Sequence, residues 1–248
     1  MSDAAVPRPV DLQTILNLLQ EGRLEIQGRF VSSSNYTFYT LVNDGGQQTF
    51  AVYKPTQGER PLWDFPAETL ALREVAAFLV SEALGWRLVP PTVYRPDGPY
   101  GPGSLQFFIQ AEPEVHYFNL PDSDKPGLRR VALFDLLINN ADRKGGHLLK
   151  DQAGKVWVID HGICFHAEKK LRTVIWDFAG ESIPDDLLAD VAQLRDRLKS
   201  EHDLKTAINS LLSPLEVAAL RRRADQVLSA RCYPTPTPGE RNFPWPPL

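Results

Sequence analysis

The sequence has few of the residues that mark secreted, zinc-binding or membrane-spanning proteins. Its 248 residues include two cysteines, too few for a disulfide framework or a four-cysteine zinc site. We therefore expect Cys164 and Cys232 to be free thiols in a reducing compartment. Residues 1–7 lack a basic region followed by an apolar run, and no segment reaches about 18 uninterrupted apolar residues. These absences predict a cytoplasmic protein without integral membrane contact.

Excess positive charge is also absent. The chain has 27 Lys and Arg against 31 Asp and Glu, which gives a net charge of −4. Nucleic-acid binders neutralise phosphates and are usually basic or carry a basic stripe. The one dense basic run, residues 221–223, falls inside an expected helix, so we predict no nucleic-acid partner. A hydrophobic content of 43% is enough for a globular core.

The first 110 residues are expected to form an N-lobe with a small antiparallel sheet and one long helix. A short amphipathic helix opens the chain behind Asp11, whose side chain can cap it. β-Branched and aromatic residues then predict strands, two of them separated by the Asn-Asp-Gly-Gly turn at 43–46. The expected segments are helices over 11–20 and 67–84, and strands over 24–28, 36–42, 49–53, 92–94 and 105–109.

Residues 111–232 are expected to form a mainly helical C-lobe. The helices cover 128–139, 185–199, 202–212 and 214–230, and two short strands cover 147–150 and 156–160. Six prolines among the last 15 residues exclude a helix or a central strand there. We predict that this Pro-rich tail, residues 233–248, lies against the C-lobe with Trp245 or Phe243 as its anchor.

Four ionisable residues occur in an order that suits phosphoryl transfer. Lys54 ends a predicted strand, and Glu74 lies in the following helix. Asp142 follows an apolar helix, and Asp160 ends the apolar strand at 156–159. Such transfer needs a cation on the nucleotide phosphates, a carboxylate that holds this cation, a carboxylate beside the attacking hydroxyl and an oxygen ligand for Mg²⁺. The order therefore predicts a nucleotide-phosphate site.

Two of these segments resemble a known family. The motif Asn140-Ala141-Asp142-Arg143, followed by a strand and Val158-Ile159-Asp160-His161-Gly162-Ile163-Cys164-Phe165, resembles the catalytic and metal-binding loops of phosphatidylinositol 3- and 4-kinases, the type II 4-kinases especially. The chain looks closest to a family of bacterial proteins related to these lipid kinases. The resemblance spans roughly residues 28–180 and implies an α+β, bilobal kinase-like fold with ATP in the cleft.

The resemblance also implies a role for each matching residue. Lys54 would bind the phosphates of ATP, with Glu74 as its helix partner. Asp142 would be the catalytic aspartate with Arg143 beside it, and Asp160 would hold Mg²⁺ or Mn²⁺. The remaining residues expected to contact the nucleotide are Ser33, Ser34 and Asn35 in the covering loop, and Phe108 and Ile109 in the adenine hinge at 107–110.

The chain departs from the family pattern at two places. The covering loop at 31–36 has no glycine, although serine hydroxyls and backbone N–H groups can still contact phosphate oxygens. His147 stands five residues after the catalytic aspartate, where an asparagine usually donates an oxygen to a second metal ion. Since imidazole is a poor ligand for Mg²⁺ and a better one for Mn²⁺ or Zn²⁺, His147 is a candidate metal ligand that would suit Mn²⁺ better than Mg²⁺.

Each candidate also has an interpretation without function. Lys54 could be a solvated edge residue and Glu74 a surface glutamate, while Asp142 and Asp160 could begin turns. The apolar strand before Asp160 favours a carboxylate that faces a cleft. Arg143, beside Asp142, is expected to be an orienting or charge-balancing group. His161 is expected to be a structural or surface histidine rather than a ligand, and Cys164 a small apolar core residue.

We therefore predict a cytoplasmic, ATP-dependent phosphotransferase whose acceptor is a protein hydroxyl or a small metabolite. A lipid acceptor is disfavoured, because the chain has neither a cysteine cluster nor a basic amphipathic helix. The serine/threonine kinases of bacterial toxin modules offer a second enzymatic interpretation. A pseudokinase that binds nucleotide and acts by regulation or interaction is the non-catalytic alternative, and His147 is the feature that favours it.

Overall fold

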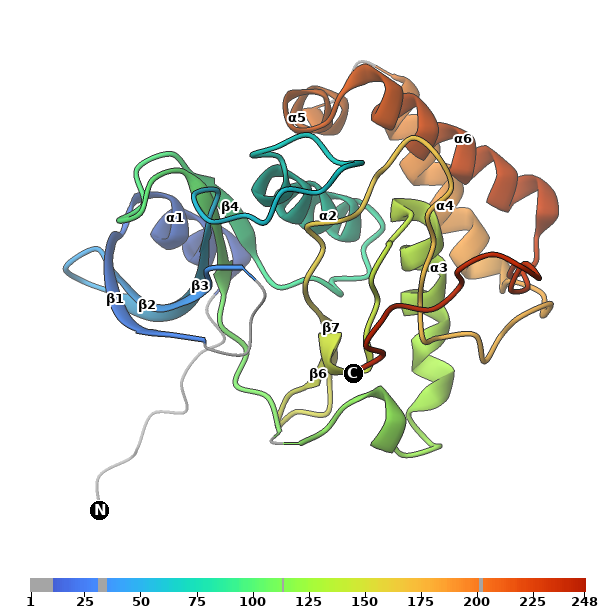
Figure 1. The fold of residues 1–248 in the computed structure, drawn as a ribbon, viewed down its shortest axis with the longest axis horizontal. Coiled ribbons are helices and arrows are strands. Elements are labelled where there is room, and N and C mark those ends of the chain that lie inside the picture. The colour runs from blue at the N-terminus through green and yellow to red at the C-terminus, as the bar shows by residue number, and fades with distance from the viewer. Residues whose placement is uncertain (1–10, 31–34, 113, 201–202) are drawn as a thin grey trace.

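The computed structural model describes residues 11–30, 35–112, 114–200 and 203–248, in which a sheet region precedes a mainly helical region (Figure 1). The helices are α1 (Leu12–Glu21), α2 (Leu70–Ala83), α3 (Leu128–Ile138), α4 (Asp185–Lys199), α5 (Asp203–Leu211) and α6 (Pro214–Ala230). The strands are β1 (Arg23–Arg29), β2 (Phe38–Asn43), β3 (Gln48–Pro55), β4 (Thr92–Arg95), β5 (Gly103–Phe107), β6 (Leu148–Lys150) and β7 (Val156–Val158). Short 3₁₀ turns are η1 (Tyr117–Asn119), η2 (Lys125–Gly127) and η3 (Gly145–His147).

The N-terminal sheet is antiparallel, with the strand order β1-β2-β3-β5-β4. Helix α1 covers one face and places Leu18 and Leu19 in a core with Phe38 and Leu105. Asp11 caps α1, because its Oδ1 accepts hydrogen bonds from the backbone N–H groups of the first turn. The sheet carries Lys54 near the end of β3.

Helix α2 joins the two regions. It contacts β4 and β5 of the sheet and also α5 of the helical region. Its buried residues Ala76, Phe78 and Val80 belong to the larger hydrophobic core, which they share with the C-terminal helices. The long helix is therefore shared between the sheet and the helical core. This arrangement places the α2 residue Glu74 at the junction. The predicted lobe boundary at residues 110 and 111 stays a prediction.

The helical region begins with α3, whose buried side chains include Phe134, Leu137 and Ile138. Asn139 ends this helix in the left-handed conformation, with φ 53°. Its side chain donates to the backbone oxygens of His166 and Glu168 at 2.9 and 2.6 Å, which ties the helix end to the segment after β7. The chain leaves α3 directly into residues 140–147 and the β6-β7 hairpin. None of the helices in the described ranges is long and apolar enough to cross a membrane.

Two strands end earlier than the sequence predicts. Strand β5 ends at Phe107, so Phe108 and Ile109 belong to the link into the helical region. Strand β7 ends at Val158, so Asp160 lies two residues beyond the strand. The N–H of Ile159 still donates to His147 O (3.0 Å), in register with the β6-β7 pairs, and the chain then turns at Asp160, which has a left-handed φ of 62°.

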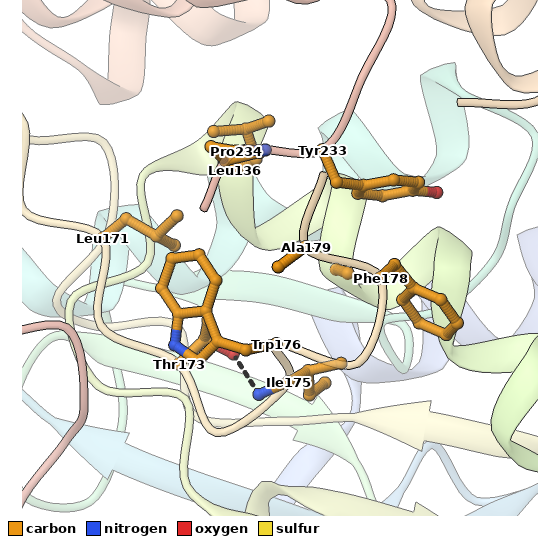
Figure 2. A pocket seen from close by; sticks show the side chains of 10 residues that line it. Leu136, Leu171, Thr173, Ile175, Trp176, Phe178, Ala179, Tyr233 and Pro234 are labelled. Carbon is orange, nitrogen blue, oxygen red and sulfur yellow. Dashed lines mark hydrogen bonds between the residues drawn. The ribbon is translucent and has the colours of Figure 1, made fainter. Parts of the chain in front are cut away.

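The Pro-rich tail lies along the helical region, as predicted, and its end reaches residues 144–147 (Figure 1). The predicted anchors are wrong, because Trp245 is 78% exposed and Phe243 is 51% exposed. Tyr233, 3% exposed, is the buried aromatic residue of the tail, and its hydroxyl donates to Arg129 O at 3.0 Å. Figure 2 shows Tyr233 packed near Phe178 around a small apolar cavity of about 20 Å³.

Backbone hydrogen bonds hold the last residues of the tail. Asn242 O accepts from the N–H of Thr173 at 3.1 Å and from Trp176 Nε1 at 3.3 Å. Pro247 O accepts from the N–H of Gly145 at 2.8 Å. Backbone hydrogen bonds and the buried Tyr233 therefore anchor the tail, while Phe243 and Trp245 remain exposed. Both cysteines are free, Cys164 buried and Cys232 exposed.

Candidate active site

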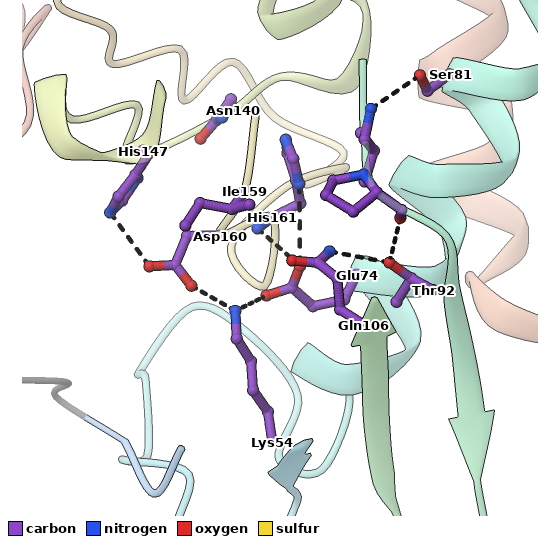
Figure 3. Close-up of polar contacts among 12 residues, drawn as sticks. Lys54, Glu74, Ser81, Thr92, Gln106, Asn140, His147, Ile159, Asp160 and His161 are labelled. Carbon is purple, nitrogen blue, oxygen red and sulfur yellow. Dashed lines mark hydrogen bonds and ion pairs between the residues drawn. The ribbon is translucent and has the colours of Figure 1, made fainter. Parts of the chain in front are cut away.

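Lys54, Glu74 and Asp160 meet where the sheet faces the helical region (Figure 3). Lys54 Nζ donates to Glu74 Oε1 at 2.6 Å and to Asp160 Oδ1 at 2.5 Å. The second oxygen of Glu74, Oε2, accepts the backbone N–H of His161 at 3.0 Å. Glu74 is thus a buried bridge that fixes both the lysine and the backbone beside Asp160. The structure brings together three predicted residues from separate segments.

The three groups stabilise one another's charges. Burial by itself lowers the pKa of Lys54, but the carboxylates of Asp160 and Glu74 outweigh this effect and raise the pKa above its usual value. The Lys54 ammonium holds the pKa of Asp160 well below its usual range, against the effect of burial, with a smaller contribution from His147. The cluster therefore contains a charged lysine and an ionised aspartate at neutral pH.

Asp160 has the backbone geometry of a specialised turn. Its φ is 62°, the left-handed region, which aspartate adopts more readily than most residues but still at a cost. The Asp160 side chain remains 48% exposed, although the residues on either side are tied down. Ile159 O accepts from Arg143 Nη1 at 2.9 Å, and His161 N–H donates to Glu74. The turn therefore presents an ionised carboxylate to the cleft.

His147 is the second partner of Asp160. Its Nδ1 accepts the backbone N–H of Lys144 at 3.4 Å, so the ring proton belongs on Nε2, which lies 3.2 Å from Asp160 Oδ2. Burial lowers the pKa of His147 to about 4, so the ring is neutral at pH 7. The imidazole thus donates a hydrogen bond to the carboxylate. Metal binding by His147 stays a prediction that this bond opposes, because Nε2 would first have to lose its proton.

Asp142 lies in the loop after α3, where Asn140 shapes the turn. Asn140 Oδ1 accepts the backbone N–H of Asp142 at 3.0 Å, and Asn140 Nδ2 donates to Asp135 Oδ1 at 2.9 Å. The Asp142 carboxylate is half-buried, and Lys144 Nζ is 3.4 Å from its Oδ2. Burial raises the pKa of Asp142 above its usual value, although Lys144 opposes this shift. A carboxylate of raised pKa is a better proton acceptor than an ordinary aspartate.

Arg143 lies inside the protein, so a catalytic role in contact with substrate does not fit its position. Its side chain and that of Asp135 are both 0% exposed, and they form a two-pronged ion pair at 2.9–3.1 Å. Arg143 also donates to Ile159 O and to His161 Nε2 at 2.9 and 2.8 Å. The orienting role is the one that agrees with this geometry, because Arg143 supports the backbone on which Asp160 stands.

The predicted nucleotide contacts have mixed positions. Ser33 and Ser34 lie outside the described residues. Asn35 Oδ1 accepts the backbone N–H of Arg60 at 3.0 Å, so its side chain is used to hold the neighbouring loop. Phe108 follows β5 and packs edge-on against Tyr39, with ring centroids 4.9 Å apart. These contacts leave the ATP-binding roles of Asn35, Phe108 and the buried Ile109 as predictions.

The residues present fit a nucleotide-bound divalent cation better than an all-protein metal centre. Within the described ranges, no three His, Cys, Asp or Glu side chains are grouped to hold a metal ion. Mg²⁺ is commonly held by one or two carboxylates together with substrate phosphates and water. Asp160, ionised and half-exposed, suits that mode.

Sequence reasoning missed three supporting groups: the side chains of Asp135 and Asn140 and the backbone N–H of His161. Asp135 had a detectable signal, since it is a lone carboxylate inside the apolar run of α3 and needs a buried cation. Asn140 was part of the recognised motif but had no assigned role. The His161 N–H carried no signal, because only the folded chain brings it to Glu74.

The chain is similar to known proteins. The protein is 43% identical to "Protein Rv2133c" of Mycobacterium tuberculosis over 92% of this chain and 94% of that protein. It is 27% identical to phosphatidylinositol 4-kinase gamma 4 of Oryza sativa subsp. japonica over 56% of this chain and 31% of that longer protein.

A solved structure supports the fold. The Golgi casein kinase crystallised with Mn/ADP superposes with a TM-score of 0.51 at 16% identity, covering 88% of this chain and 74% of that one. The predicted α+β kinase-like fold is therefore confirmed. The family described as phosphatidylinositol 3- and 4-kinase matches residues 68–219, which include Glu74, Asp142 and Asp160. This family match, together with the fold, supports a kinase-like phosphotransferase. Because that match covers more than half of the chain, this protein belongs to the phosphatidylinositol 3- and 4-kinase family.

Proposed function

We propose that this protein transfers the terminal phosphoryl group of ATP to a hydroxyl group of a protein or a small metabolite, with Mg²⁺ or Mn²⁺. The contact of Lys54 with both Glu74 and Asp160, at 2.6 and 2.5 Å, carries the proposal. A solvated edge lysine has no need of two carboxylates from distant segments. Here the cation for the phosphates, its holder and the metal carboxylate share one cluster, as phosphoryl transfer requires.

Each residue has a distinct task in this proposal. Lys54, oriented by Glu74, neutralises charge on the nucleotide phosphates, and Asp160 supplies a hard oxygen to the divalent ion. The ion, when bound, neutralises charge that develops during transfer. Asp142 accepts the proton of the attacking hydroxyl at its carboxylate, which burial has made more basic. Arg143, inside the protein, keeps the loops of Asp142 and Asp160 in register through its bond to Ile159 O.

The acceptor is proposed from the chemistry of the chain. A net charge of −4 and the lack of a basic amphipathic helix disfavour a lipid surface as the acceptor. The solved Golgi kinase is named for casein, a protein acceptor, and was crystallised with Mn/ADP. The charge of the chain and the name of that kinase support a protein or metabolite hydroxyl as the acceptor. The bound Mn/ADP of that kinase supports Mn²⁺ as an effective metal.

Titration calorimetry with ATP in the presence and absence of Mg²⁺ or Mn²⁺ tests the binding step. We expect Asp160→Ala to remove the metal-dependent part of the affinity. Lys54→Met should weaken ATP binding by about tenfold or more, the loss expected for a hydrogen bond to a charged group. Lys199→Met is the matched control, because Lys199 pairs with Asp225 on the surface of the helical region. Equal ATP affinity with and without metal, or unchanged affinity in Lys54→Met, would contradict the proposal.

A nucleotide-binding pseudokinase is the second candidate, and the His147–Asp160 contact favours it. A neutral imidazole at 3.2 Å from Asp160 Oδ2 occupies the place where family members use an oxygen ligand. Transfer of labelled phosphate from ATP to protein or metabolite pools distinguishes the two candidates. Metal-dependent ATP binding without any transfer, in both the native protein and His147→Asn, would favour the pseudokinase.

A further inference from the structure

A second pocket, lined by none of the candidate active-site residues, lies in the helical region. It has a volume of about 330 Å³, within the range of about 300–1,000 Å³ that small-molecule sites occupy. Its walls come from the end of α3, one face of α6, the segment at 167–176 and the tail at 234–242. The lining residues that matter below are Lys169, Arg222, Arg223, Leu171, Trp176 and Pro234.

The pocket is positively charged. Its lining includes Lys169, Arg222 and Arg223 but neither Asp nor Glu. Lys169 pairs with Glu240 at 2.9 Å, on the exposed side. Neither arginine forms an ion pair with a carboxylate of the described residues. Two arginine side chains therefore line this pocket without an ion-pair partner among the described residues.

Arg223 shows most clearly that charge is uncompensated there. Its Nε donates to Leu137 O at 2.7 Å and its Nη1 to His166 O at 3.3 Å, which caps the end of α3. The remaining nitrogen, Nη2, is buried and has no hydrogen-bond partner among the described residues. Burial lowers the pKa of Arg223 to about 10, with a further contribution from Arg222 and a smaller opposing effect of Glu216, which is itself paired with Arg73. A buried cation without an anion is costly, so binding of an anion here would be favoured.

Part of the pocket wall is apolar. Leu171, Trp176 and Pro234 line it, and the same residues border the small apolar cavity shown in Figure 2. An inorganic ion would leave this wall uncovered. The charged and the apolar parts of the lining together fit a molecule with an anionic group at one end and an apolar or aromatic part at the other.

We propose that this pocket binds a small organic phosphate, at a site separate from the nucleotide cleft. A phosphate dianion matches two unpaired guanidinium groups, and the planar arginine fork suits phosphate oxygens. A carboxylate with one charge would leave the pocket positive. The apolar part of the ligand lies against Leu171 and Trp176. The bound molecule would connect α6 to the segment that donates Arg172 N–H to Asn140 O at 2.9 Å, beside Asp142.

Calorimetry on the full chain with phenyl phosphate and inorganic phosphate, at constant ionic strength, tests the proposal. We expect one phenyl phosphate per chain, bound more tightly than inorganic phosphate because the ring covers the apolar wall. Arg222→Gln should raise the phenyl phosphate Kd by about tenfold, as expected for loss of a charge-assisted hydrogen bond. Arg221→Gln is the matched control, since Arg221 adjoins Arg222 on α6 but does not line the pocket. Arg223 is left intact because it caps α3.

Lys54→Met separates this site from the nucleotide cleft, and it should leave phenyl phosphate binding unchanged. Failure of ATP binding would not affect this result, so the two proposals fall independently. The absence of saturable phenyl phosphate binding in the millimolar range would overturn the inference. Equal weakening in Arg221→Gln and Arg222→Gln would overturn it too, as would loss of binding in Lys54→Met. Inorganic phosphate that binds as tightly as phenyl phosphate would show that the apolar wall contributes nothing, and would also overturn it.

Discussion

Replacing Arg143 by methionine should destabilise the protein strongly, because Arg143 is fully buried in an ion pair with Asp135. Methionine retains much of the side-chain volume but leaves Asp135, 0% exposed, with the Nδ2 of Asn140 at 2.9 Å as its remaining side-chain donor. Ile159 O also loses its 2.9 Å donor. Breaking one partner of a buried ion pair costs about 3–5 kcal/mol. At about 2–4 °C per kcal/mol for a chain of this size, the Tm should fall by about 10 °C.

Urea unfolding followed by circular dichroism measures this loss. The double variant Asp135→Leu with Arg143→Met should recover most of the lost stability, because it no longer buries a lone charge. Its ATP affinity should stay well below that of the native protein, since Ile159 O beside Asp160 still lacks its donor. Arg130→Met, at an exposed site on the same helix as Asp135, should change the free energy of unfolding by less than about 0.5 kcal/mol. A loss below about 1 kcal/mol for Arg143→Met, or a double variant no more stable than the single one, would refute the reasoning.

Two further predictions concern pH and the tail. The pKa of His147 is about 4 in the folded protein and about 6.5 in the unfolded chain, so its contribution to stability is complete above pH 6.5 and is lost as the pH falls to 4. Across this interval, the change in the free energy of unfolding should differ by about 3 kcal/mol between the native protein and His147→Asn. Parallel curves of unfolding free energy against pH would contradict this prediction. Tyr233→Ala should lower the free energy of unfolding by about 3–5 kcal/mol, as for other buried aromatic residues. Trp245→Ala, at a site 78% exposed, should lower it by less than about 0.5 kcal/mol. The reverse order in thermal unfolding would show that the tail is anchored elsewhere.

Local sequence patterns were sufficient for most segments. The capping residue Asp11, the spacing of apolar residues in α3 and α6, and the Asn-Asp-Gly-Gly turn before β3 are signals within a few neighbouring residues. The order of Lys54, Glu74, Asp142 and Asp160 was likewise legible, because each stands at the end or on the face of a recognisable segment. Catalytic chemistry needs particular residue types, and those types are visible without coordinates.

Which residues face the cleft was decided only by tertiary structure. Arg143 and Asp142 are neighbours in the chain, yet one is fully buried against Asp135 and the other is half-exposed. The neutral state of His147 depends on burial and on the Lys144 N–H, and neither is visible in a one-dimensional pattern. The tail behaved similarly, because composition favoured Trp245 while packing against Phe178 selected Tyr233. The sequence by itself determined the segments and the reactive residue types, since those depend on local interactions. The tertiary structure determined the burial, charge state and hydrogen-bond partners of each side chain, since those depend on long-range contacts.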